Sequence, residues 1–226
     1  MIRIGILDVS ECEPCDFKIG TGSSPSVLER IEKTKNPKEK LERGAAYALL
    51  ERMYRDACFG AQMPEIIYTP SGKPHFFENK DCHFSISHSS GAVTVVIADC
   101  EVGVDIQADL LNEGTKSRVG KRFRDSLLAL DKRCGDEPEV NFCFYEIRNG
   151  EILPSPNADV IENVTKEKAD GEFYSKWTLL EAALKLDGGG FSSIGSLPGI
   201  VGGASFLTVK FDVRGREFAL SLATKK

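Results

Sequence analysis

The sequence has no long apolar run. None approaches the ~18 residues that a membrane-spanning helix needs, which argues against a membrane protein. Positive charge is not in excess either, since 29 Lys and Arg residues face 34 Asp and Glu residues and give a formal net charge of −5. Because general nucleic-acid-binding proteins are normally basic, this class is excluded as well. The first residues are too polar and form too short a stretch for a signal peptide, so we expect a cytoplasmic protein.

The seven cysteines are scattered, and their spacing predicts no disulfide framework. Cys12-Glu-Pro-Cys15 has the C-x-x-C spacing, but a structural zinc site needs four ligands, and no second close pair of Cys or His follows. A redox motif would begin a helix, whereas Pro14, Gly20 and Gly22 are typical of a loop. We interpret the two cysteines as reduced loop thiols, and a redox or zinc module remains the alternative.

The periodicity of the apolar residues predicts an α+β protein. The chain has 226 residues, enough for one large domain or two lobes of about 100 residues each. Periods of two and of 3.6 residues predict strands at 2–7, 207–213 and 218–222 and helices within 27–57 and 176–187. Asn149-Gly150 and Arg214-Gly215 are typical hairpin turns. The polar segment 154–171 is interpreted as a loop.

Two short β-branched runs, 92–98 and 102–106, form the centre of the chain and are typical of buried strands. The polar turn 99–101 between them predicts a hairpin. Before the first run lies a segment rich in hydroxyl groups, 85–91, which we interpret as a loop carrying Ser87 and His88. The second run contains Asp105, whose carboxylate is costly to bury unless a cation or hydrogen-bond donors compensate it.

A second polar group lies on the predicted helix 176–187. Trp177, Glu181 and Lys185 are spaced at i, i+4 and i+8, which puts them on one stripe of the helix. A simple ion pair between Glu181 and Lys185 is the structural explanation. It accounts for neither Asp105 nor the Ser-His segment.

Basic residues are concentrated at three places. Lys73 lies in a loop stiffened by prolines 70 and 74, and it either contacts a phosphate or is only solvated. Arg43 belongs to a run of lysines and glutamates that is typical of a solvated helix face. Residues 115–133 contain seven basic and two acidic side chains, which indicates a patch for an acidic partner in an otherwise acidic protein.

Taken together, these motifs resemble a known family. Gly103-Val-Asp105-Ile followed by Trp177-Thr-x-x-Glu181-Ala-x-x-Lys185 resembles the two signature motifs of the 4′-phosphopantetheinyl transferases of the long, surfactin-synthetase-activating type. The resemblance extends to Arg43 and to three further segments, Ser71-Gly-Lys-Pro74, Phe84-Ser-Ile-Ser-His88-Ser and Lys121-Arg-Phe123. The matches follow the family's order between residues 38 and 195.

The resemblance implies a fold and a reaction. The fold would be a monomer of two similar pseudo-twofold lobes, each a small, mainly antiparallel sheet packed with helices. Lobe 1–102 would contact the nucleotide of coenzyme A, and lobe 103–226 would hold the metal and face the carrier. The enzyme would transfer the phosphopantetheine arm of coenzyme A to a serine of an acyl or peptidyl carrier protein and release adenosine 3′,5′-bisphosphate. Mg²⁺ would be the cofactor, with Mn²⁺ as the other possibility.

The resemblance also implies roles for individual residues. The metal ligands would be Asp105, Glu181 and Gln107, in keeping with the preference of Mg²⁺ for hard oxygen ligands. Glu181 would help to deprotonate the carrier serine, and Asp105 and Lys185 would complete the catalytic group. The phosphates of coenzyme A would be held by Arg43, Lys73, Ser87, His88 and Lys185. The basic segment 115–133 and the hairpin near 142–153 would face the acidic carrier protein.

Three positions depart from the family pattern. Gln107 stands where an acidic residue is frequent, which lowers the expected metal affinity. Leu180 replaces the usual lysine before the glutamate, and Gly189 stands where another basic residue is common. Because both carboxylates and Lys185 are present, we expect an active enzyme. The alternative is a non-catalytic relative that binds coenzyme A or the carrier protein.

Overall fold

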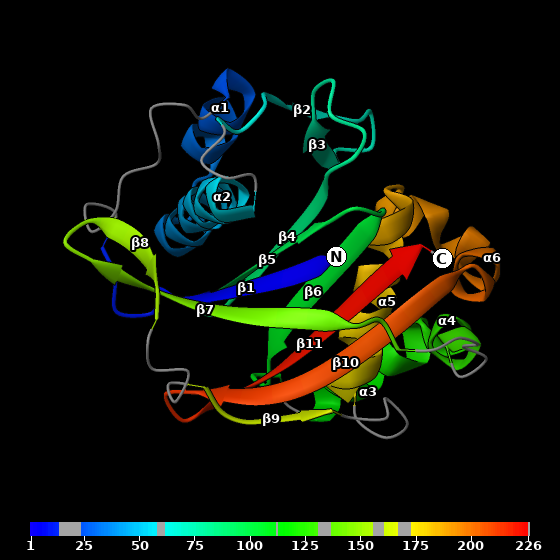
Figure 1. The fold of residues 1–226 in the computed structure, drawn as a ribbon. Coiled ribbons are helices and arrows are strands. Elements are labelled where there is room, and N and C mark those ends of the chain that lie inside the picture. The colour runs from blue at the N-terminus through cyan, green and yellow to red at the C-terminus, as the bar shows by residue number, and fades with distance from the viewer. Residues whose placement is uncertain are drawn as a thin grey trace. The chain divides into compact units, whose positions relative to one another are not determined.

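The computed structural model describes residues 1–13, 24–57, 62–111, 113–130, 137–155, 161–166 and 173–225. The chain forms two compact units, drawn in Figure 1. Unit 1 consists of Met1–Cys100 and Glu139–Ala158, and unit 2 of Glu101–Pro138 and Asp159–Lys226. The first boundary lies close to the expected boundary at residue 102. The expected lobe 103–226 differs from the structure, however, because residues 139–158 return to unit 1.

A five-stranded sheet in the order β4-β5-β1-β7-β8 organises unit 1. Its strands are β1 (Ile2–Asp8), β4 (His83–Ser89), β5 (Ala92–Ala98), β7 (Val140–Arg148) and β8 (Glu151–Pro154). Neighbouring strands are antiparallel except β1 and β7, which run parallel. This parallel pairing is the reason why residues 139–158 belong to unit 1.

Two helices and a small hairpin complete unit 1. They are α1 (Pro25–Lys33), α2 (Pro37–Ala57), β2 (Ile66–Tyr68) and β3 (Pro74–Phe76). Helix α2 packs one face against the sheet, where Leu49, Leu50 and Met53 are buried with Phe84 and Val95. The helices expected within 27–57 are therefore confirmed, with an interruption between α1 and α2.

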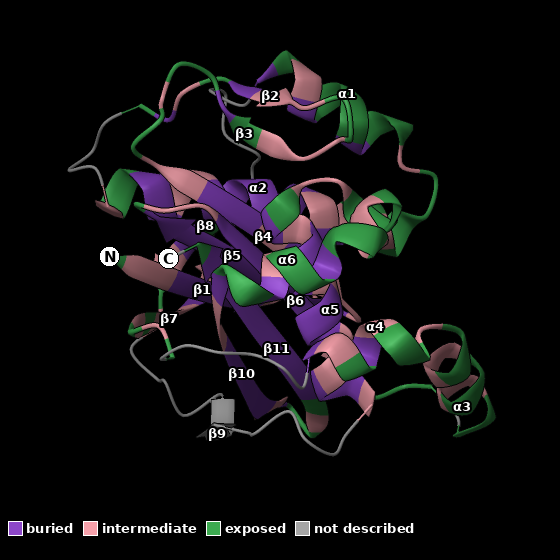
Figure 2. Cartoon of the chain, turned by 90° about the vertical axis from the view of Figure 1, so that its right-hand side faces the viewer, coloured by how far each residue is buried: buried purple, intermediate pink, exposed green. Residues whose placement is uncertain are grey.

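Unit 2 is built on a four-stranded antiparallel sheet in the order β6-β11-β10-β9. Its strands are β6 (Val102–Ala108), β9 (Ile161–Lys166), β10 (Ala204–Val213) and β11 (Arg216–Lys225). Its helices are α3 (Glu113–Arg122), α4 (Arg124–Ala129), α5 (Phe173–Asp187) and α6 (Leu197–Gly202), with a 3₁₀ segment η3 (Gly190–Ser196) between α5 and α6. Helix α5 packs on β6 and β11 and is largely buried, whereas α3 has no buried residue (Figure 2).

The coarse prediction of fold is confirmed: the protein is α+β, with small, mainly antiparallel sheets packed with helices. The pseudo-twofold relation between the two lobes stays a prediction. None of the helices in the described part of the chain combines the length and apolar character that a membrane crossing needs.

Two of the predicted hairpins are confirmed by their turns. Asn149-Gly150 joins β7 to β8, and Arg214-Gly215 joins β10 to β11. In each turn both residues have positive φ, 52° and 82° in the first and 52° and 73° in the second. This conformation matches the right-handed twist of a two-residue hairpin.

Three other predictions for connections and loops were wrong. Strands β5 and β6, which the turn 99–101 joins, lie in different sheets, because β5 pairs with β1 and β4 while β6 pairs with β11. The segment 85–91, expected to be a loop, is strand β4 and its turn into β5. The expected loop 154–171 contains strand β9, which pairs with β10.

Candidate functional site

Strand β6 presents its polar residues to helix α5. Side chains alternate along a strand, so Gly103, Asp105 and Gln107 share one face, and Val104 and Ile106 point to the other. The face with Gly103 meets α5: a Cβ on this glycine would lie 2.1 Å from the carbonyl oxygen of Ala182 in α5. Only a residue without a side chain lets the helix backbone come this close to the strand.

A buried hydroxyl contact fixes α5 against the next strand of the sheet. The hydroxyl oxygens of Thr178 in α5 and Ser221 in β11 are 2.8 Å apart, and both residues are fully buried. Ser221 pairs with Asp105 of β6 in the strand register. The glycine contact and this hydrogen bond together set which residues of α5 lie beside Asp105.

Lys185 of α5 forms an ion pair with Asp105. Its Nζ lies 2.7 Å from Oδ1 of Asp105, whose side chain is 1% exposed, against 32% for Lys185. Gln107 Nε2 donates a hydrogen bond of 3.3 Å to the other carboxylate oxygen, Oδ2. The cation and donors that the sequence predicted for a buried Asp105 are therefore present.

Glu181 lies within hydrogen-bonding distance of Asp105, one helical turn before Lys185. Burial and the negative charge of Asp105 raise the pKa of Glu181 to about 7, although Lys185 and a hydrogen bond with Trp177 act in the opposite direction. The hydrogen bond with Asp105 also raises the pKa, because it favours the protonated form of Glu181. Near neutral pH this carboxyl group can both accept and release a proton.

The donor set fits a hard divalent cation. Two carboxylates at hydrogen-bonding distance repel each other, and a cation between them would relieve the repulsion that raises the pKa of Glu181. The amide oxygen of Gln107 is a third oxygen ligand of the kind that Mg²⁺ accepts. Within the described ranges, no group of three or more His, Cys, Asp or Glu side chains is suited to a metal ion. Substrate oxygens or water would therefore have to complete the coordination.

Leu180 and Phe123, two further residues that the sequence motifs single out, pack in unit 2 near the helix α5. Leu180 is fully buried in a cluster with Leu127 and Leu130. A lysine at this position would have to bury its charge, which is costly without a partner. Phe123 packs its ring 5.4 Å from that of Trp177. This contact brings the segment Lys121-Arg-Phe123 to the helix that carries Glu181 and Lys185.

In unit 1 the structure pairs His88 with a residue that sequence reasoning missed. His88 lies on β4, and its Nδ1 is 2.7 Å from Oε2 of Glu42 in α2. The other carboxylate oxygen of Glu42 accepts a hydrogen bond of 2.6 Å from the backbone N–H of Gly91. Glu42 extends the apolar stripe of α2, at i−4 from Ala46 and i−7 from Leu49, and this position was the signal that it would be buried.

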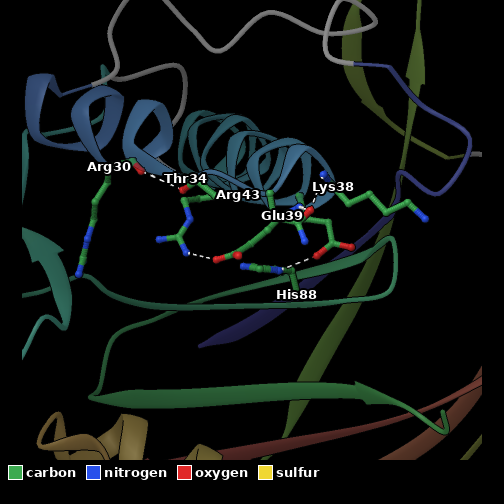
Figure 3. A network of polar contacts seen from close by, with 8 residues as sticks. Arg30, Thr34, Lys38, Glu39, Arg43 and His88 are labelled. Atoms are coloured by element: carbon green, nitrogen blue, oxygen red, sulfur yellow. Dashed lines mark hydrogen bonds and ion pairs between the residues drawn. The ribbon is translucent and has the colours of Figure 1, made fainter. Parts of the chain in front are cut away.

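Arg43 lies on the same part of α2 and points toward the carboxylate of Glu39 in Figure 3. It donates a hydrogen bond of 2.7 Å to Glu39 one turn earlier. Its Nε is buried and has no hydrogen-bond partner among the described residues. The Arg43 side chain is 26% exposed, and a guanidinium group is of the kind that binds a phosphate.

The other two predicted phosphate contacts lie elsewhere in unit 1. Ser87 precedes His88 on β4, so its side chain points to the opposite face of the sheet, and it is buried. Lys73 lies in the turn between β2 and β3, where its backbone N–H donates to the hydroxyl of Thr69. The carbonyl of the adjacent Gly72 accepts a hydrogen bond from Arg30, which also lies over the ring of Tyr68. Of the predicted residues of unit 1, Arg43 lies on α2, and His88 contacts this helix through Glu42.

The cysteine pair is covered only in part. Cys12 is half-buried, and Cys15 lies outside the described residues. Most of the basic segment 115–133 forms helices α3 and α4, where Arg118, Lys121 and Arg124 are exposed. Lys116 differs, because it is paired with Asp109 and Glu113.

Comparison with protein-family models and with curated proteins gave no match for this chain.

Proposed function

We propose that this protein is a 4′-phosphopantetheinyl transferase, which moves the phosphopantetheine arm of coenzyme A to a serine of an acyl or peptidyl carrier protein. The observation that carries the proposal is the group formed by Asp105, Glu181 and Lys185 in unit 2. These are the three residues that the two sequence motifs single out. The protein would work as a monomer in the cytoplasm.

Glu181 would act as the proton acceptor. The serine oxygen forms a bond to the pyrophosphate phosphorus that carries the pantetheine arm, and the bond to the bridging oxygen of the nucleotide breaks. Adenosine 3′,5′-bisphosphate leaves with the electron pair of that bond, and the serine proton passes to Glu181. A base acts in its deprotonated form, and a cation held beside Asp105 would offset the repulsion that raises the pKa of Glu181 to about 7 in its absence.

Asp105 and Lys185 would hold opposite charges at the reacting group. Lys185 is partly exposed, so its ammonium group can neutralise charge on the pyrophosphate while it remains near Asp105. Asp105, Glu181 and Gln107 would hold Mg²⁺, which when bound supplies electrostatic stabilisation of the pyrophosphate oxygens. In unit 1, Arg43 and His88 would bind phosphate groups of the nucleotide.

The test is a transfer assay read by mass spectrometry. The purified protein, coenzyme A, Mg²⁺ and an apo carrier protein are incubated, and the carrier gains the mass of phosphopantetheine if the proposal holds. One fatty-acid carrier and one peptide-synthetase carrier are tested side by side. Glu181→Gln should abolish the transfer and leave the circular dichroism spectrum unchanged. An unimpaired variant would remove Glu181 from the chemistry.

A second candidate function is a non-catalytic protein that binds coenzyme A or the carrier. The buried Leu180 favours it, because no cation stands directly before Glu181. So does Gln107, whose amide adds no negative charge to the metal site. Binding of coenzyme A by calorimetry without a mass gain on either carrier would support this function against the first.

A further inference from the structure

Glu42 is a buried carboxylate with two hydrogen-bond partners from another part of unit 1. The residue is 8% exposed. Its Oε1 accepts from the N–H of Gly91, and its Oε2 lies 2.7 Å from Nδ1 of His88. Burial alone would raise the pKa of Glu42, but the hydrogen bonds with His88 and Gly91 outweigh it and hold this pKa below its usual value. Glu42 is therefore a fixed negative charge at neutral pH.

Glu39, one turn earlier on α2, is a useful contrast. Its side chain is 45% exposed, and its carboxylate pairs with Arg43 of the same helix (Figure 3). Exposed pairs at i,i+4 contribute little to stability and exchange readily with solvent. Glu42 instead joins the helix to the imidazole on β4 and to the turn that follows this strand. Because both oxygens of Glu42 are engaged, the carboxylate holds the His88 ring in one orientation.

The two contacts of Glu42 determine the protonation of the imidazole. Because Gly91 donates to Oε1 and an ionised carboxylate only accepts, the atom of His88 that faces Oε2 must carry a proton. That atom is Nδ1, so Nε2 is the nitrogen on the far side of the ring from Glu42. To donate to a phosphate, Nε2 must carry a proton as well, so the ring binds the anion as the imidazolium.

We propose that Glu42 is a positioning residue for phosphate binding: it holds His88 with Nδ1 protonated, so that Nε2 and the positive charge of the ring are available to the phosphate groups of the nucleotide. This inference rests on the proposed function, since it takes coenzyme A and adenosine 3′,5′-bisphosphate as the ligands. Arg43, which follows Glu42 on α2 and is partly exposed, would be the second cation for these phosphate groups.

The inference predicts the sign of one effect. If Glu42 were merely a negative charge near a phosphate site, Glu42→Gln would remove repulsion and strengthen the binding of an anion. If Glu42 positions His88, the same substitution weakens binding. The glutamine oxygen then accepts from Gly91, its amide group donates to Nδ1, and the ring becomes neutral, with its proton on Nε2.

The experiment measures adenosine 3′,5′-bisphosphate binding by calorimetry. Glu42→Gln and His88→Gln should each weaken binding about tenfold, the scale of one charge-assisted hydrogen bond. The double variant should bind no more weakly than His88→Gln alone, because residues that act through one another are not additive. The matched control is Glu51→Gln on the same helix, whose carboxylate pairs with Arg55 at 3.2 Å and should leave the affinity unchanged.

A spectroscopic readout is independent of the ligand. In ¹⁵N-labelled protein, the ring nitrogen shifts of His88 should show a protonated Nδ1 in the wild type and a tautomer with the proton on Nε2 in Glu42→Gln. Equal ring spectra, stronger binding by Glu42→Gln, or additive losses in the double variant would each overturn the inference.

The failure of this inference and the failure of the proposed function give different results. Wild-type protein that binds the bisphosphate but transfers nothing to any carrier would contradict the proposed transferase activity and would not affect the proposed role of Glu42. Intact transfer with unweakened binding by Glu42→Gln would sink the inference alone. No binding by the wild type would overturn both, the inference through its ligand and the proposed function through its nucleotide site.

Discussion

The substitution Glu181→Gln should stabilise unit 2 at alkaline pH while it abolishes the proposed transfer. The pKa of Glu181 rises from 4.5 to about 7 on folding, because the side chain is buried and lies beside Asp105. Between these two values the folded protein holds a proton that the unfolded chain has lost. Stability therefore falls as the pH rises through this window, and the full penalty is present above pH 7.

The size of the effect follows from the shift. A difference of about 2.5 pKa units corresponds to about 3 kcal/mol, since each unit is worth about 1.4 kcal/mol. Glutamine keeps the shape of the side chain and has no charge. At pH 8 the variant should therefore be more stable than the wild type by up to this amount, and at pH 4 this difference should be absent. The shift in midpoint would be roughly 6–12 °C for a chain of this length.

Tryptophan fluorescence is the assay, because Trp177 is the only tryptophan and lies on α5 one turn before Glu181. Thermal unfolding of the wild type and the variant is compared at pH 4 and pH 8. The control is Glu217→Gln in the same unit, whose carboxylate is 57% exposed and should give no pH-dependent difference. A variant that is less stable than the wild type at pH 8, or equally shifted at both pH values, would refute the reasoning.

Three further predictions concern unit 2. Gly103→Ala should destabilise the unit by about 1–3 kcal/mol and stop transfer, because its Cβ would collide with the backbone of α5. Gly120→Ala on α3 is the control, since a Cβ there meets nothing, and it should be neutral or slightly stabilising. Unfolding followed by tryptophan fluorescence measures both. Lys185→Met should cost about 3 kcal/mol by removing the cation that pairs with the buried Asp105, and adding Asp105→Asn should restore most of that stability in urea unfolding without restoring activity. Arg118→Glu on the exposed helix α3 should slow transfer to an acidic carrier at low salt and leave coenzyme A binding unchanged, as initial rates at two ionic strengths and calorimetry would show.

Local sequence signals predicted the parts of the fold that local chemistry determines. The turn Asn149-Gly150 requires two residues with positive φ, and this pair adopts that conformation at little cost. The stripe Trp177, Glu181 and Lys185 follows from the helical period alone, and the helix is present at these residues. In these cases the physical cause lies within a few residues of the pattern.

Long-range pairing decided the parts that the sequence did not predict. Two apolar strands with a polar turn form either a hairpin or a crossing from one sheet to another, and the turn itself does not distinguish them. Strand β5 pairs with β1 and β4. Strand β6 pairs with β11, which lies more than 100 residues further along the chain. The contact between Glu42 and His88 spans 46 residues in the same way. The spacing of Glu42 from Ala46 and Leu49 indicates a buried position, but it does not show which strand supplies the partners of the carboxylate.

The energetics of the carboxylate pair argue for a function rather than for stability. A protein selected only for a stable α5–β6 contact would avoid two acidic groups in one buried place, because burial and mutual repulsion both penalise their ionised forms. Lys185 pairs with Asp105 and offsets part of this penalty, yet the pKa of Glu181 still rises to about 7. Neutral replacements at Glu181 are expected to be more stable, which agrees with the proposed role of this acid as a proton acceptor or a cation ligand. The opposite behaviour of Glu42 fits this reading, since its hydrogen bonds lower the pKa and make it a fixed charge instead of a titrating one.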